Sequence, residues 1–161
     1  MNRFFLTTTA ALVLGFAAAW AGPLEDGVAA YQRGEYTTAF SSFRALAIEG
    51  NVAAQFNLGQ MYRLGHGVPR DVVEAARWYH LGAAQGDAQS QYNLGVMYYN
   101  GQGVLRNFVF SHMWLTLSAM SGAENAVRNR IMLVKQMTPA QIAEALQLAR
   151  TCKQLDFKNC D

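Results

Sequence analysis

Apolar residues recur along most of this chain with the spacing of one face of an α-helix. Between residues 52 and 64, for example, the small and apolar positions Ala54, Leu58, Met61 and Tyr62 fall on one side of a helix with 3.6 residues per turn. No segment shows the strict alternation of apolar and polar residues that is typical of a half-buried strand. The pattern therefore predicts an all-α protein.

Glycine and capping residues divide the predicted helices into pairs. Gly65 and Gly101 are expected to end the first helix of each pair, because glycine tolerates the left-handed conformation of a helix C-cap. Asp71 and Asn107 are good N-caps for the second helix. The helices of two such pairs are expected at about residues 52–64 and 72–85, and at about residues 88–100 and 108–120.

The two pairs are copies of one another. When Gly50–Gln85 is aligned with Gly86–Ser121, fifteen of the 36 positions are identical. Glycine, tryptophan and tyrosine residues coincide in this register, which shared composition alone would not produce. Gly59 and Gly95 lie inside the first helices, where glycine costs about 1 kcal/mol relative to alanine. Their recurrence therefore predicts a close crossing of two helices.

Different helix pairs flank the two copies, as is usual for terminal repeats. The upstream pair has a short turn at Gly34-Glu35, and the downstream pair, which we interpret as a closing cap, contains the capping box Thr138-Pro139-Ala140-Gln141. The predicted units are residues 24–49, 50–85, 86–121 and 122–152, within a single domain of residues 22–161 that ends in an irregular tail at residues 153–161.

The two copies resemble the Sel1-like repeat over about residues 50–122. They read AQFNLGQMYRLGHGVPRDVVEAARWYHLGAAQG and QYNLGVMYYNGQGVLRNFVFSHMWLTLSAMSG. The upstream pair, AYQRGEYTTAFSSFRALA, looks more like a tetratricopeptide unit. The resemblance implies a right-handed α-solenoid. The second copy departs from the pattern at Ser111 and Leu115, where alanine and tyrosine are usual, and we expect this departure to loosen its packing.

The resemblance also implies a function. Proteins of this family are mostly adaptors that hold proteins or peptides in a concave groove, which favours a non-enzymatic scaffold. Exported bacterial members are often linked to envelope assembly or exopolysaccharide secretion, so an accessory protein of cell-envelope polysaccharide export is the alternative. One cysteine-rich subgroup is tied to β-lactam binding or hydrolysis. Because both repeats here lack cysteine, we do not carry a β-lactamase-like activity over.

Residues 1–21 have the pattern of a signal peptide. A positive charge at Arg3 precedes an apolar run from Phe4 to Ala19, and Ala19-Trp20-Ala21 fits the small-x-small motif of signal peptidase. We expect cleavage after Ala21, with Ala19 as the second choice, and a periplasmic or secreted protein. An uncleaved membrane anchor is the alternative, although a run of about 16 residues is shorter than the roughly 20 that a spanning helix needs.

The charge content argues against nucleic acid as a partner, and the two cysteines predict a disulfide. The net charge is +2 and charged residues make up 15% of the chain, so no concentrated basic face is available for nucleic acid. The two cysteines, Cys152 and Cys160, lie close together near the C-terminus. In an oxidising compartment we expect them to form a disulfide that ties down the tail. The sequence leaves the partner and the oligomeric state open.

The sequence contains no motif for catalysis, a cofactor or a metal ion. His66, His80 and His112 lack H-x-x-x-H spacing, and no nucleophile with a positioned base is apparent. The Gly-x-Gly linkers follow helices rather than strands, which is the wrong context for a phosphate loop. Trp78 and Trp114 lie on the apolar stripes of their helices, so we assign both to the core.

The remaining functional candidates lie on the first helix of each copy, which lines the inner surface of a helix–turn–helix solenoid. Asn57 and Asn93 recur at one position and offer both a donor and an acceptor to a peptide backbone, and neighbouring aromatic rings can stack on a ligand. The need to satisfy buried polar groups favours the alternative, in which the asparagines bond to the adjacent linker and the aromatic residues fill the seam between repeats. The candidate partner-binding residues are Phe56, Asn57, Gln60, Arg63, Tyr92, Asn93, Val96 and Tyr99.

Overall fold

The structure, a computed structural model, describes residues 22–158 and 160, and the predicted signal peptide lies outside them. Every regular element in this range is an α-helix, which confirms the predicted fold class. The helices are α1 (Pro23–Gln32), α2 (Tyr36–Ile48), α3 (Val52–Leu64), α4 (Val72–Ala83), α5 (Ala88–Asn100), α6 (Phe108–Met120), α7 (Glu124–Val134) and α8 (Pro139–Gln154).

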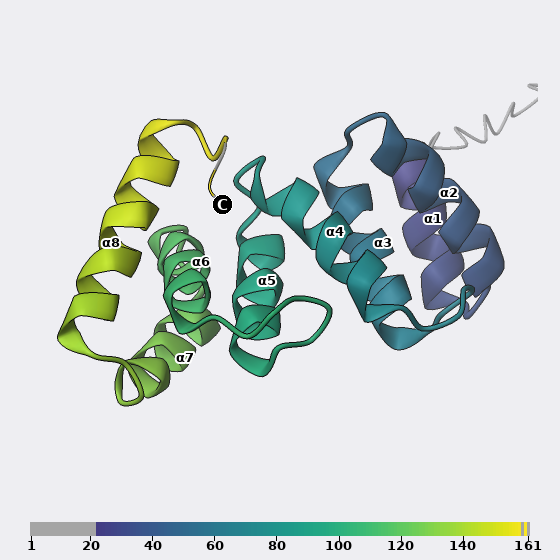
Figure 1. The fold of residues 1–161 in the computed structure, drawn as a ribbon. Coiled ribbons are helices and arrows are strands. Elements are labelled where there is room, and N and C mark those ends of the chain that lie inside the picture. The colour runs from purple at the N-terminus through teal and green to yellow at the C-terminus, as the bar shows by residue number, and fades with distance from the viewer. Residues whose placement is uncertain (1–21, 159, 161) are drawn as a thin grey trace, which may run out of the picture.

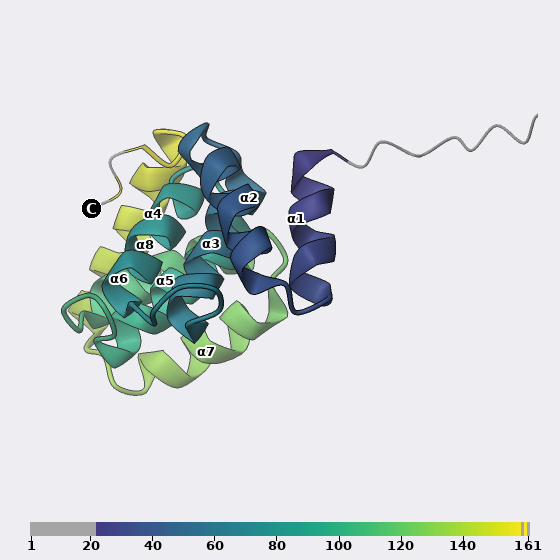
Figure 2. The same cartoon turned by 90° about the vertical axis from the view of Figure 1, so that its right-hand side faces the viewer.

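The helices stack as antiparallel pairs into an all-α solenoid (Figure 1). Helix α1 packs against α2, α3 against α4, and α5 against α6. Successive pairs are joined by contacts of α2 with α3, α4 with α5, and α6 with α7. In Figure 2 the α1–α2 end of the stack is turned toward the viewer.

The recurring glycines let the two helices of each repeat cross closely. A Cβ atom at Gly59 would lie 2.9 Å from ring atoms of Tyr79 on α4, and one at Gly95 would lie 2.9 Å from Cγ of Leu115 on α6. Tyr79 and Leu115 are buried, so neither helix has room for even a methyl group at the crossing. The close crossing predicted from the register is confirmed.

The turn and capping residues act as predicted. Gly65 and Gly101 end α3 and α5 in the left-handed conformation, with φ of 76° and 67°. The side chains of Asp71 and Asn107 each accept two backbone N–H groups at the starts of α4 and α6. These contacts satisfy backbone groups that a helix end leaves unpaired.

Helix α6 is buried on all sides. Every residue from 111 to 118 is buried, including the polar Ser111, His112, Thr116 and Ser118, because α5, α7 and α8 enclose the helix. Ser111 Oγ donates a hydrogen bond to the carbonyl of Gly95 at 2.8 Å, and Leu115 fills the space above Gly95. The expected loosening at these two positions was therefore wrong, because Ser111 gains a hydrogen bond that alanine cannot make and Leu115, although smaller than tyrosine, packs directly on Gly95.

The two equivalent tryptophans differ in burial. Trp114 is fully buried in the central core cluster, whereas Trp78 is half-buried against the cluster formed by α1, α2 and α3. The core assignment is confirmed in full for Trp114 and in part for Trp78. Helix α8 covers α6, and no described helix packs over α4 in the same way.

The last two helices do not form a repeat-like pair. Helix α8 packs against α6, whereas α7 and α8 make almost no contact with each other. The 36-residue register gives the reason, since Ile131 occupies the position of Gly59 and Gly95, and Arg130 occupies that of Leu94. A branched side chain where the repeats need glycine prevents a following helix from crossing α7 closely. Helix α8 therefore crosses α6 and closes the core there.

Helix α8 begins as predicted and ends later than expected. The hydroxyl of Thr138 accepts a hydrogen bond from the backbone N–H of Gln141, and the Gln141 side chain accepts one from the backbone of Thr138, which completes the capping box. At the other end, the N–H of Leu155 still donates to the carbonyl of Thr151 at 3.0 Å. This bond extends the helix to Gln154, into the segment expected to be irregular.

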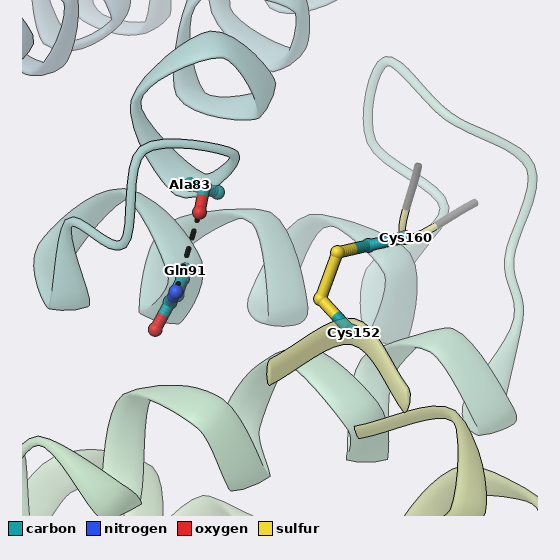
Figure 3. Close-up of a disulfide and its surroundings, with 4 residues drawn as sticks. All are labelled: Ala83, Gln91, Cys152 and Cys160. Carbon is teal, nitrogen blue, oxygen red and sulfur yellow. Dashed lines mark hydrogen bonds between the residues drawn. A yellow bond between two sulfur atoms is a disulfide. The ribbon is translucent and has the colours of Figure 1, made fainter. Parts of the chain in front are cut away.

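The C-terminal segment folds back onto the repeats. A disulfide joins Cys152 to Cys160 (Figure 3), and both residues are buried in the central core cluster. The ring of Phe157 lies against Gly86 in the turn between α4 and α5, and it also packs on the central cluster. The segment therefore covers the junction between the two repeats.

Reduction of this disulfide is expected to lower the free energy of unfolding by about 2.5 kcal/mol, the value that the entropy of closing so short a loop implies. The two cysteines are separated by 8 positions. Urea unfolding with and without dithiothreitol measures the effect. The double variant Cys152→Ser/Cys160→Ser is the control, and dithiothreitol must leave its unfolding curve unchanged. Equal stability of the oxidised and reduced native protein would contradict the prediction.

Candidate functional site

We call the exposed sides of α3, α5 and α7 together the inner face. Between α5 and α7 it holds a cavity of about 260 Å³. The walls are largely apolar, with Leu115 and Leu133 buried, while Met132 is 59% exposed at the mouth. The lining residues are Val96, Tyr99, Asn100, Leu115, Asn129, Met132 and Leu133.

Hydrogen bonds to α7 and its following turn hold two tyrosines of α5 in place. The hydroxyl of Tyr92 accepts a bond from Nδ2 of Asn129 at 3.2 Å, and that of Tyr99 accepts one from Nε2 of Gln136 at 2.8 Å. The Tyr99 ring also stacks on Phe108, with 5.6 Å between ring centroids. One ring face of Tyr99 is therefore occupied, and the two tyrosines connect α5 to α7 and to the turn that follows it.

An asparagine recurs at one position on α3, α5 and α7. Asn57 and Asn93 follow the repeat register, and Asn129 continues it 36 residues further on. Nδ2 of Asn93 donates to the carbonyl of Gln89 in its own helix at 2.8 Å, so the expected alternative of a bond to the linker is wrong for Asn93. Within the described residues, Oδ1 of Asn93 and of Asn129 accepts no hydrogen bond. Both oxygens can therefore accept a backbone N–H from a ligand.

The candidates in the first copy are largely engaged in packing and in internal hydrogen bonds. The Phe56 ring lies 6.0 Å from that of Tyr79, which belongs to the same repeat, and packs on the central core, so Phe56 is a packing residue. Arg63 donates to the hydroxyl of Tyr79 at 3.3 Å and to Oε1 of Gln60 at 3.0 Å. Burial raises the pKa of Tyr79, and the hydrogen bond from Arg63 acts in the opposite direction. These side chains support α4 rather than the cavity.

The cavity joins residues that the sequence predicted with residues that it did not single out. Val96 and Tyr99 were predicted and lie in its wall, whereas Asn129 and Met132 were missed. The sequence similarity between the copies ends near residue 121. The register itself continues, because Met132 follows Val96 by 36 positions and Asn129 follows Asn93 by the same distance. The continued register could therefore have identified Asn129 and Met132 from the sequence.

The three histidines occupy separate environments. His66 shares a hydrogen bond of 2.9 Å with the hydroxyl of Tyr31, and His80 lies edge-on to Trp114. His112 is buried on α6, where burial and then the positive charge of Arg130 lower its pKa. Among residues 22–158 and 160, no group of three or more His, Cys, Asp or Glu residues is placed to hold a metal ion.

Comparison with protein families decides the identity of the repeats. The Sel1 repeat model matches residues 52–87 and 88–122, which are the two units of the 36-residue register displaced by one or two residues. The chain contains two Sel1 repeats. Sel1 repeat proteins generally act as scaffolds for protein–protein interaction, and their fold is typically non-enzymatic.

Solved structures show the same architecture. A protective antigen present in uropathogenic Escherichia coli strains, which displays an SLR fold, aligns with a TM-score of 0.79 at 31% identity over 86% of this chain and 30% of that one. A Sel1 repeat protein from Oxalobacter formigenes aligns with a TM-score of 0.61 at 33% identity over 64% of this chain and 42% of that one. The aligned part of this chain thus covers less than half of either structure.

No curated protein matches the chain at a significant level. Among the described helices, none combines the length and the apolar character needed to span a membrane.

Proposed function

We propose that this protein is an exported, non-enzymatic scaffold that binds a peptide segment of a protein partner on its inner face. The observation that carries the proposal is the cavity between α5 and α7, where the apolar side chains of Val96 and Met132 adjoin the amide of Asn129. Mostly apolar concave sites with a few polar groups are typical of ligand binding. A site of this size accommodates one aliphatic or aromatic side chain of a partner.

The asparagines and the cavity would recognise different parts of such a segment. Oδ1 of Asn93 and of Asn129 would accept main-chain N–H groups, which favours no particular sequence, and the cavity would select an apolar side chain.

Export is part of the proposal. The pattern of residues 1–21 supports it, and so does the Cys152–Cys160 disulfide, since disulfides persist in oxidising compartments. Cleavage after Ala21 would leave Gly22 at the new N-terminus, directly before α1 at Pro23. Removal of the signal segment would therefore leave all the described helices intact.

Photocrosslinking in cells tests the binding surface. A photoreactive residue at Asn93 or Met132 is expected to capture a protein partner, and the same residue at Gln147, exposed on α8, is expected to capture none. Asn93→Ala should then weaken binding of the captured partner about fivefold, the loss of about 1 kcal/mol for one hydrogen bond, while Gln147→Ala should leave it unchanged. Capture from Gln147 alone would contradict the proposal. Retention on a glycan column that is lost in Tyr99→Ala would favour a polysaccharide ligand instead.

A further inference from the structure

One face of α7 has no helix over it among the described residues. In the repeats, the second helix of each pair covers the corresponding face of the first, but α8 packs on α6 and leaves α7 uncovered. Val127 and Ile131 are exposed on this face, at 37% and 55%. With the exposed side chains of Glu124 and Lys135, they form what we call the α7 stripe.

The α7 stripe carries opposite charges at its two ends. Spacings of three and four residues place Glu124, Val127, Ile131 and Lys135 along one side of the helix. Glu124 is the first residue of α7, and Lys135 is its C-cap. Neither forms an ion pair within the described part of the chain. From the N-terminal to the C-terminal end, the stripe is negative, apolar, apolar and positive.

A stripe with this order is complementary to its own copy running in the opposite direction. We propose that α7 pairs with α7 of a second copy of this chain in an antiparallel dimer with twofold symmetry. Glu124 of each copy then faces Lys135 of the other, and Val127 of each faces Ile131 of the other. A twofold axis makes every such contact occur twice. A parallel arrangement would instead place like charges opposite each other.

The rest of the helix is consistent with this arrangement. The helix dipole alone explains an acidic residue at the start of α7 and a basic one at its end. It does not explain Val127 and Ile131, which stand where the second repeat has Gln91 and Gly95. The other cations of α7 lie to either side of the stripe, since Arg128 donates to the side chain of Asn125 and Arg130 lines the neighbouring cleft with His112.

The proposed contact is small, so the dimer is expected to be weak. Helix α7 has 11 residues and is about 16 Å long. One such helix from each copy buries less area than the roughly 1,200–2,000 Å² of a stable interface. The cleft of about 310 Å³ that Arg130 and His112 line, together with Ile131, Val134 and Leu146, lies beside the stripe. We expect a dissociation constant on the order of 10–100 µM.

Sedimentation equilibrium of the disulfide-bonded protein, over about a hundredfold range of concentration around that value, tests the proposal. The expected result is a reversible monomer–dimer equilibrium. Glu124→Lys and Lys135→Glu each place like charges opposite one another and should weaken the dimer about tenfold. The double variant Glu124→Lys/Lys135→Glu restores complementary charges and should recover most of the affinity, which a merely structural role of either residue would not produce.

Ile131→Asp is expected to give a monomer with an unchanged circular dichroism spectrum, because the side chain is exposed in the monomer. Leu105→Asp is the matched control, since Leu105 is 90% exposed in the linker before α6 and should leave the dimer intact. A native protein that is monomeric throughout, a dimer that tolerates Ile131→Asp, or a double charge reversal no better than the single ones would overturn the proposal. These measurements contain no ligand, so they are independent of peptide binding on the inner face.

Discussion

Replacing Trp114 with alanine is expected to lower the free energy of unfolding by about 3–5 kcal/mol. The side chain is fully buried, and it shares the central core cluster with Tyr79 of α4 and with Ala149 and Cys152 of α8. The substitution opens a cavity bordered by helices from different parts of the chain, which cannot all move into it. Since domains of this size are stable by only about 5–15 kcal/mol, the loss would be a large part of the total.

Chemical denaturation followed by circular dichroism measures this loss, and Trp78→Ala is its matched control. Trp78 occupies the same position one repeat earlier but is half-buried, so its replacement should cost clearly less. The comparison isolates what the covering helix α8 adds to the burial of Trp114. Equal losses at the two positions would contradict this account of the core.

Gly103→Ala is expected to destabilise the protein by about 3 kcal/mol. Gly103 has φ of 71°, and a Cβ atom there would lie 2.1 Å from the carbonyl oxygen of Val72 at the start of α4. The left-handed conformation costs an alanine about 1–2 kcal/mol, and displacing the backbone to relieve the overlap adds about 1–3 kcal/mol. Gly67 makes the equivalent contact with the carbonyl of Tyr36, at 2.4 Å, so each linker is held against the preceding pair.

The variant Gly122→Ala separates the cost of the left-handed backbone conformation from the cost of the steric overlap. Gly122 also has a positive φ, 88°, but a Cβ atom there would meet nothing within 4 Å. Its replacement should therefore cost only the backbone term of about 1–2 kcal/mol. Urea unfolding of the two variants gives the difference, which is the steric contribution of the linker contact. If Gly103→Ala were no worse than Gly122→Ala, the linker would have room to shift away from α4.

The repeat register identified residues whose roles became clear only in three dimensions. Gln55 and Gln91 are identical in the register and buried. Each donates a side-chain hydrogen bond at 3.2 Å to a carbonyl of the preceding pair, Ala47 or Ala83 (Figure 3 shows the second). The recurrence was visible in the sequence, but the acceptor was not, because it lies in another helix.

The candidate site, too, was visible in the sequence only in part. Val96 and Tyr99 could be assigned to the inner face because their positions within one helix define a face. Phe56 belongs to the same face by sequence, yet it packs on Tyr79 and on the core. The walls supplied by Met132 and Leu133 come from α7, and no pattern within α5 specifies which helix lies beside it.

By itself, the sequence determined the helices, their caps, the repeat length and the close crossings at Gly59 and Gly95. Caps, glycines and apolar stripes act within a few turns of the chain, so these signals can be read locally. Only the tertiary structure decided that α8 crosses α6, that the C-terminal segment lies over Gly86, and that α7 keeps an uncovered face. Those outcomes depend on whether distant surfaces fit together, and at Ile131 the side chain that stands in place of glycine is too large for the fit that the repeats use.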